Sequence, residues 1–142
     1  MAIASICYAG SKEIHIITID AIINPVTADY IATEIEFAED NDIEALIIEL
    51  DTPGGLMESM RLIVKAELAS RVPIVLYVSP SGSRAASAGV FITMAAHIAV
   101  MDEGTNIGAA HPVGIGGESS SDSSDVMWDK VTNDAVAQKG IC

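Results

Sequence analysis

The chain has 142 residues, half of them hydrophobic and only 4% aromatic, which is enough for one domain with an aliphatic core. Its formal net charge is −13, with 7 Lys and Arg against 20 Asp and Glu, so binding to the phosphate backbone of nucleic acid is disfavoured. The sequence contains no run of about 18 apolar residues and therefore predicts no membrane span.

The first ten residues, MAIASICYAG, are apolar and small. They fit either the cleavage end of a signal peptide or a frayed N-terminus. We take residues 11–142 as one domain. The two cysteines, Cys7 and Cys142, stand at opposite ends and form no metal-binding motif, and we expect neither a metal nor a cofactor.

Helical and strand patterns alternate along the chain. Alternating or continuous short apolar runs predict strands at Glu13–Asp20, Ala45–Leu50, Ile74–Val78 and Ile98–Met101. Three helices are predicted between them: one begins at the Asn24 cap and Pro25, one carries Met57, Met60, Val64 and Leu68 on one face, and one covers Ala85–Ala96. This order predicts an α/β fold with a mainly parallel sheet.

The remainder of the chain gives weaker signals. Residues 105–117 are glycine-rich and are predicted to be irregular. Residues 118–125 (ESSSDSSD) are acidic and of low complexity, which is typical of a surface loop. Residues 126–138 fit a further helix with Asp125 as its cap.

Two segments that each follow a predicted buried strand could support chemistry. Asp51–Gly55 (DTPGG) precedes a helix, so the amides of Gly54 and Gly55 are candidates for an oxyanion hole. Ser87, in Ser83–Gly89 (SRAASAG), is flanked by residues too small to block a substrate. Each segment also has a plainer interpretation, a tight turn for the glycines and a small-residue packing surface for the serine. Because successive parallel strands end at one edge of the sheet, we expect the two segments to meet there.

These residues resemble a known family. DTPGG, SRAASAG and the segment GTNIGAAHP at 104–112 are similar, in combination and in order, to the nodulation efficiency protein D proteases. This family of membrane-associated serine proteases is also called the stomatin operon partner proteins. It belongs to the Clp-protease and crotonase superfamily, whose fold consists of repeated β-α units. The resemblance covers residues 13–137.

The resemblance implies an ATP-independent serine endopeptidase with a Ser–Lys dyad. It assigns Ser87 as the nucleophile, Lys130 as the base, and Gly54 and Gly55 as the glycine turn facing the nucleophile. It also implies a hydrophobic segment of a stomatin-like membrane protein as substrate and partner, and a homodimer. The full-length protein is expected to be anchored in a membrane with the protease domain outside the cytoplasm. Gly89 is expected to be a packing partner.

The base must meet a further physical condition. A lysine acts as a base only when neutral, so its pKa must fall from about 10.4 to about 7–8. Asp134, four residues after Lys130, could pair with it and oppose that fall. His111 is an alternative base, as in the Clp proteolytic subunit. His15 and His97 are expected to be structural, and Lys139 to be a surface residue.

Two other functions remain open. A crotonase-like acyl-CoA enzyme would use similar paired amides but would need basic residues for the CoA phosphates, and the chain has few. A domain with the same fold could also be an inactive interaction module. After Ala137 the sequence QKGIC departs from the family, which continues into a longer helix, so we expect C-terminal truncation or an altered reading frame.

Overall fold

The computed structural model of the protein describes residues 13–108. Its elements follow the order β-α-β-α-β-β-α-β-β. They are β1 (Ile14–Asp20), α1 (Pro25–Asp40), β2 (Ala45–Asp51), α2 (Met57–Ala69), β3 (Ile74–Val78), β4 (Arg84–Ala86), α3 (Ala88–Ala95), β5 (Ile98–Met101) and β6 (Asn106–Gly108).

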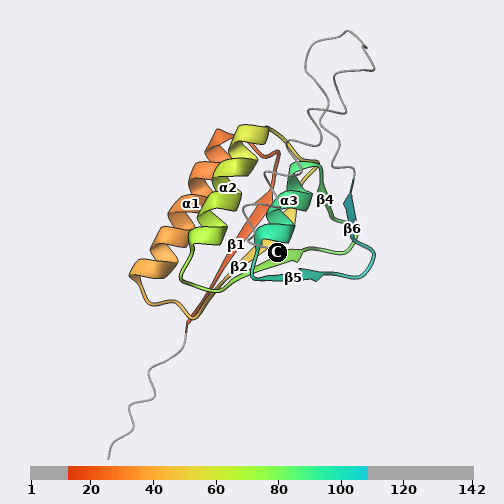
Figure 1. Cartoon of the computed structure of the whole chain (residues 1–142). Coiled ribbons are helices and arrows are strands. Elements are labelled where there is room, and N and C mark those ends of the chain that lie inside the picture. The colour runs from red at the N-terminus through yellow and green to blue at the C-terminus, as the bar shows by residue number, and fades with distance from the viewer. Residues whose placement is uncertain (1–12, 109–142) are drawn as a thin grey trace, which may run out of the picture.

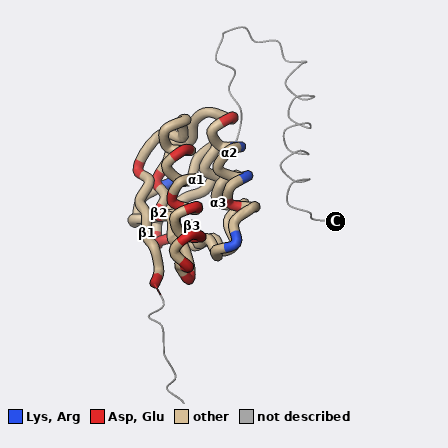
Figure 2. Tube along the Cα trace, turned by 90° about the vertical axis from the view of Figure 1, so that its left-hand side faces the viewer, with Lys and Arg blue, Asp and Glu red and all other residues tan. Residues whose placement is uncertain are grey.

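The main sheet is parallel, as the alternation of strands and helices predicts. Its strand order is β1-β2-β3-β5, and every neighbouring pair is parallel. The short strands β4 and β6 form a second parallel pair. Helices α1, α2 and α3 pack beside one another on one face of the main sheet (Figures 1 and 2). The carboxyl ends of the strands therefore lie at one edge, where the candidate segments begin.

The core lies between this sheet and the helices. Leu46, Ile48 and Leu50 on the central strand β2 are fully buried and alternate with partly buried residues. The opposite face of the sheet carries no helix from the described residues. It presents the register row Ile16, Ile47, Val75 and Ile98, of which Ile16 is 57% and Ile98 54% exposed. Within residues 13–108, no helix is long and apolar enough to cross a membrane.

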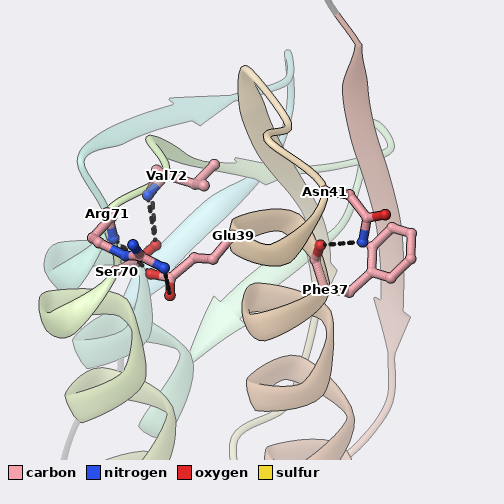
Figure 3. Close-up of polar contacts among 6 residues, drawn as sticks. All are labelled: Phe37, Glu39, Asn41, Ser70, Arg71 and Val72. Carbon is pink, nitrogen blue, oxygen red and sulfur yellow. Dashed lines mark hydrogen bonds and ion pairs between the residues drawn. The ribbon is translucent and has the colours of Figure 1, made fainter.

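Helix α1 begins and ends where local side chains satisfy its free backbone groups. The Asn24 side chain accepts a hydrogen bond from the Thr27 N–H at 3.0 Å, and Pro25 is the first helical residue, as predicted. At the other end, the Asn41 side chain donates to the Phe37 carbonyl at 2.8 Å (Figure 3). Each end therefore has a cap that the sequence itself provides.

One ion pair joins the ends of α1 and α2. Arg71, just beyond α2, donates from its backbone N–H and from its guanidinium to the carboxylate of Glu39, at 2.8 and 3.2 Å (Figure 3). These contacts lower the pKa of Glu39, the backbone hydrogen bond most strongly. Because both groups reach solvent, the pair orients the helix ends more than it stabilises the fold.

The buried face of α2 differs from the predicted one. Met60 and Val64 are buried as predicted, but Leu68 is 39% exposed. Glu67 takes its place and is fully buried, with no hydrogen-bond partner for either carboxylate oxygen among the described residues. At about 100° per residue, position 67 lies closer than 68 to the centre of the stripe set by Met60 and Val64. Burial raises the pKa of Glu67 well above its usual value.

Two segments near the site also differ from prediction. The helix predicted for Ala85–Ala96 begins only at Ala88, because residues 84–86 form β4. Residues 106–108, predicted to be irregular, form β6 and pair with β4. Both strands are three residues long and owe their extended conformation to pairing with distant segments, which a local pattern does not reveal.

Candidate active site

Ser87 lies between β4 and α3, at the N-cap position of the helix. Its φ of 51° and ψ of −112° place a non-glycine residue at positive φ, a conformation that costs about 1–3 kcal/mol. The Ser87 side chain makes no capping hydrogen bond with α3, and the residue is partly exposed. A serine on a strained strand-to-helix turn is a recurrent way of presenting a nucleophile.

Three segments that are distant in sequence meet at Ser87. They are the end of β2, the β4 strand with Ser87, and the end of β6. At the end of β2, the Asp51 carboxylate accepts a hydrogen bond from the Arg84 N–H at 3.0 Å, and Thr52 forms a β-bridge with Ala85. At the end of β6, the Gly108 carbonyl accepts a hydrogen bond from the Ser87 N–H at 3.0 Å. The strained turn is thus held from both sides.

Gly54 packs directly against Ser87. A Cβ atom added at Gly54 would lie 2.6 Å from Ser87 Cβ and 3.2 Å from Ser87 Oγ, and Gly54 has a φ of +108°. The Gly54 N–H donates to Thr52 Oγ1 at 3.1 Å, and its carbonyl accepts from the Ile23 N–H at 2.8 Å. Gly54 therefore gives Ser87 room, while its own amide is engaged within the turn.

The amide of Gly55 is placed differently. The Gly54 carbonyl and the Leu56 N–H both bond to Ile23, so residues 54–56 pair with Ile23 along one side. The Gly55 N–H belongs to the same trans peptide unit as the Gly54 carbonyl, so it points away from Ile23. The Gly55 N–H has no acceptor among the described residues. Of the two predicted oxyanion donors, Gly55 is therefore the one whose N–H is not engaged within the turn.

The first turn of α3 adds further donors. The N–H groups of Ala88 and Gly89 have no backbone acceptor among residues 13–108, as expected for a helix start. A Cβ atom at Gly89 would lie 2.7 Å from Thr52 Cγ2, so Gly89 packs closely, as expected, against the turn that precedes Gly54. Neither the Ala88 amide nor Thr52 was singled out from the sequence. The threonine two residues before Gly54 was the available signal, since its hydroxyl can close such a turn.

The two candidate bases, Lys130 and His111, lie outside the described residues. The two described histidines have structural partners, as predicted. His15 Nε2 lies 2.6 Å from Glu34 Oε2, and His97 Nδ1 accepts from the Ile74 N–H at 3.1 Å. Within the described part of the chain, no group of three or more His, Cys, Asp and Glu residues is arranged to hold a metal ion.

The arrangement can therefore serve nucleophilic chemistry on a carbonyl. A hydroxyl on a strained turn lies beside a glycine segment with an unengaged N–H and at the start of a helix. Such N–H donors stabilise the negative charge that develops on a carbonyl oxygen when a nucleophile attacks the carbonyl carbon. Fold and site together define a Clp-protease-like α/β domain with a parallel sheet, similar in structure to solved proteases of that type.

The chain belongs to the family described as NfeD1b, N-terminal domain, whose model matches residues 13–141. It is 41% identical over 100 residues to the membrane-bound protease PH1510 of Pyrococcus horikoshii, covering 70% of this chain and 23% of that protein. It is 25% identical over 130 residues to the membrane protein NfeD1b of Bacillus subtilis, covering 92% and 29%. The chain thus spans less than a third of the length of either relative.

The solved structures agree with this placement. The 1510-N membrane-bound stomatin-specific protease, solved as a serine-to-alanine variant, matches with a TM-score of 0.74 and 34% identity, covering 91% of this chain and 61% of that one. A lysine-to-alanine variant in complex with a substrate peptide matches equally well in TM-score, over 89% and 57%. ClpP1 of Listeria monocytogenes shares the fold alone, with a TM-score of 0.62 at 16% identity over 87% and 65%.

Proposed function

We propose that this chain is the protease domain of an ATP-independent serine endopeptidase with a Ser–Lys dyad. Ser87 Oγ attacks the scissile carbonyl, and Lys130 takes the hydroxyl proton and returns it to the leaving amine. The oxyanion is held by the Gly54–Gly55 turn, with the Gly55 N–H as its main donor and the Ala88 N–H as a second. The acyl group on Ser87 is then released by water.

The observation that carries this proposal is the placement of Ser87. It is a serine at positive φ with its side chain uncapped, and a glycine turn packs against its Cβ. A residue selected only for packing would gain nothing from this strain. The comparison with 1510-N supports the same reading, because that protease was studied as serine and lysine variants.

The proposed substrate is drawn from the relatives. The 1510-N protease is described as stomatin-specific and was solved with a substrate peptide. We extend this to a hydrophobic segment of a stomatin-like membrane protein as the substrate and partner of the present chain. From the family resemblance we also propose a homodimer and a membrane-associated parent protein with the protease domain outside the cytoplasm.

Active-site labelling tests the nucleophile. The folded 142-residue chain is treated with a fluorophosphonate, and the modified residue is located by mass spectrometry. We expect modification at Ser87 and none in Ser87→Ala. Ser81→Ala is the matched control, because Ser81 is an exposed serine in the loop before β4. If the folded chain is not labelled at Ser87 and Ser87→Ala retains proteolysis, the proposal is wrong.

The base is tested by three variants compared side by side. Lys130→Ala should abolish labelling and peptide cleavage, whereas Lys139→Ala, a charge change of the same kind nine residues later, should leave both intact. His111→Ala decides between the two candidate bases. Loss of activity in His111→Ala with activity retained in Lys130→Ala would replace the dyad with a histidine-based site.

A further inference from the structure

A polar cleft opens beside the glycine turn, at the carboxyl ends of β1 and β2. It has a volume of about 460 Å³, and its polar side chains come from Asp20, Asp51, Arg84 and Asn106. Pro53, which directly precedes Gly54, also lines it. The cleft therefore adjoins the proposed oxyanion turn but is separate from the Ser87 hydroxyl.

Most polar groups of this cleft lack protein partners. Asp51 uses one carboxylate oxygen to accept from the Arg84 N–H. The side chains of Asp20, Arg84 and Asn106 make no hydrogen bond or ion pair among the described residues. All three are exposed, so they reach solvent and are accessible to a ligand.

The charges of the cleft do not balance. Two aspartates and one arginine line the cleft, which leaves one net negative charge, and the whole chain carries −13. A ligand with a single positive charge would neutralise the cleft, whereas an anion would be repelled by two carboxylates and attracted by only one guanidinium. The chemistry of the cleft thus favours a lysine or arginine side chain.

The position of the cleft relates it to the proposed reaction. Arg84 precedes Ser87 by three residues along the β4 turn, so at about 3.3 Å per residue the two lie within about 10 Å. An extended peptide covers that length with about three residues. We infer that the cleft is a specificity subsite that binds a basic side chain two or three residues from the scissile bond. This inference rests on the proposed peptidase function.

Arg84 has a defined part in this subsite. Its backbone N–H, not its side chain, holds Asp51 and the start of β4. The guanidinium is therefore free to oppose an incoming cation, and removing it should strengthen the preference for lysine. Asp20→Asn should weaken that preference, and Asn106→Asp should strengthen it. One variant is thus expected to weaken the preference for lysine and two to strengthen it.

The test uses apolar peptides that differ at one position, with Lys, Gln or Glu placed two or three residues to either side of the cleaved bond. We measure kcat/KM with the wild-type chain and binding with Ser87→Ala by fluorescence anisotropy. At one of these positions Lys should be preferred over Gln by about two- to fivefold, the range for solvent-accessible ion pairs, and Glu disfavoured. The preference should decline with added salt.

The variants decide the outcome. The ratio of kcat/KM for the Lys peptide to that for the Gln peptide should fall towards one in Asp20→Asn. It should rise in Arg84→Gln and Asn106→Asp. Asp40→Asn is the matched control, since it removes one exposed carboxylate at the far end of α1 and should keep the wild-type ratio. An equal loss in Asp20→Asn and Asp40→Asn, or no discrimination among the peptides, overturns the subsite.

Binding and cleavage separate this inference from the proposed function. If Ser87→Ala binds Lys peptides in an Asp20-dependent way but the wild-type chain cleaves none, the cleft binds a basic side chain as inferred, and the peptidase proposal fails. If peptides are cleaved at Ser87 with no Asp20-dependent preference, the peptidase proposal stands and the subsite is wrong.

Discussion

Gly54 and Ser87 pack so closely that the space between them admits no side chain at position 54. A Cβ atom at Gly54 would lie 2.6 Å from Ser87 Cβ and 3.0 Å from the Ala86 carbonyl oxygen. The two residues are 33 positions apart: Gly54 follows β2 of the main sheet, and Ser87 follows β4 of the second strand pair. Their contact joins the glycine turn to the strained serine, and it makes both residues sensitive to small substitutions.

Gly54→Ala should therefore damage the site more than the fold. Alanine at φ +108° costs about 1–2 kcal/mol of backbone strain, and its methyl group would displace the Ser87 side chain. We expect a modest loss of stability in urea unfolding and a loss of fluorophosphonate labelling at Ser87. Gly82→Ala is the matched control: it has a φ of +88° and open space around it, so it should lose stability but keep labelling. Equal labelling in both variants would contradict this prediction.

Gly55→Ala should instead damage the fold. A Cβ atom there would overlap the Ile23 carbonyl oxygen, a backbone atom that cannot move without breaking the bridge between the two segments. We expect a loss of about 1–3 kcal/mol or more in thermal or urea unfolding. Gly108→Ala, where a Cβ meets no atom within 4 Å, should remain close to wild type. A wild-type unfolding midpoint for Gly55→Ala would show that the segment pairs differently.

Thr52→Val should loosen the glycine turn without changing its volume. The buried Thr52 hydroxyl accepts from the Gly54 N–H, and its removal leaves that donor unpaired at a cost of about 1–3 kcal/mol. We expect lower stability together with slower labelling of Ser87. Thr52→Ser keeps the hydroxyl and should label at nearly the wild-type rate. If the serine variant loses labelling as strongly as the valine variant, the methyl contact with Gly89 matters more than the hydrogen bond.

Glu67→Gln should alter the pH dependence of stability. Burial raises the pKa of Glu67 above its usual value of 4.5. Above pH 4.5 the carboxyl group of Glu67 therefore remains protonated in the folded state, whereas in the unfolded state it has lost its proton. The stability present below that pH is lost as pH rises towards the folded pKa, at no more than about 1.4 kcal/mol per unit. Wild type and Glu67→Gln should match in acid, and the variant should become relatively more stable as pH rises.

The measurement is urea unfolding at several pH values between 4 and 8. Glu58→Gln, an exposed glutamate in the first turn of the same helix, is the control and should follow the wild-type curve. A constant difference between wild type and Glu67→Gln across this range would mean that the carboxyl group does not titrate differently on folding.

Much of the fold could be predicted because its signals are local. The Asn24–Pro25 start of α1, the buried strand Ile74–Val78 and the order of strands and helices all follow from short patterns of capping and hydrophobicity. Even the meeting of the glycine turn with Ser87 was predictable, because parallel strands end at one edge of a sheet. The predicted face of α2 was wrong at its last position, because Glu67, one residue before the predicted Leu68, lies nearer the centre of the buried stripe.

The sequence by itself determined an α/β domain with a serine and a glycine turn at one sheet edge, since capping, hydrophobic period and strand order are properties of neighbouring residues. The tertiary structure alone decided that residues 84–86 form a strand, that Asp51 and Gly108 hold Ser87 at positive φ, and that Gly55 rather than Gly54 has a free amide. These features depend on pairing between segments tens of residues apart. The sequence of a short segment does not reveal such pairing, because the distant segments with which it pairs determine its conformation.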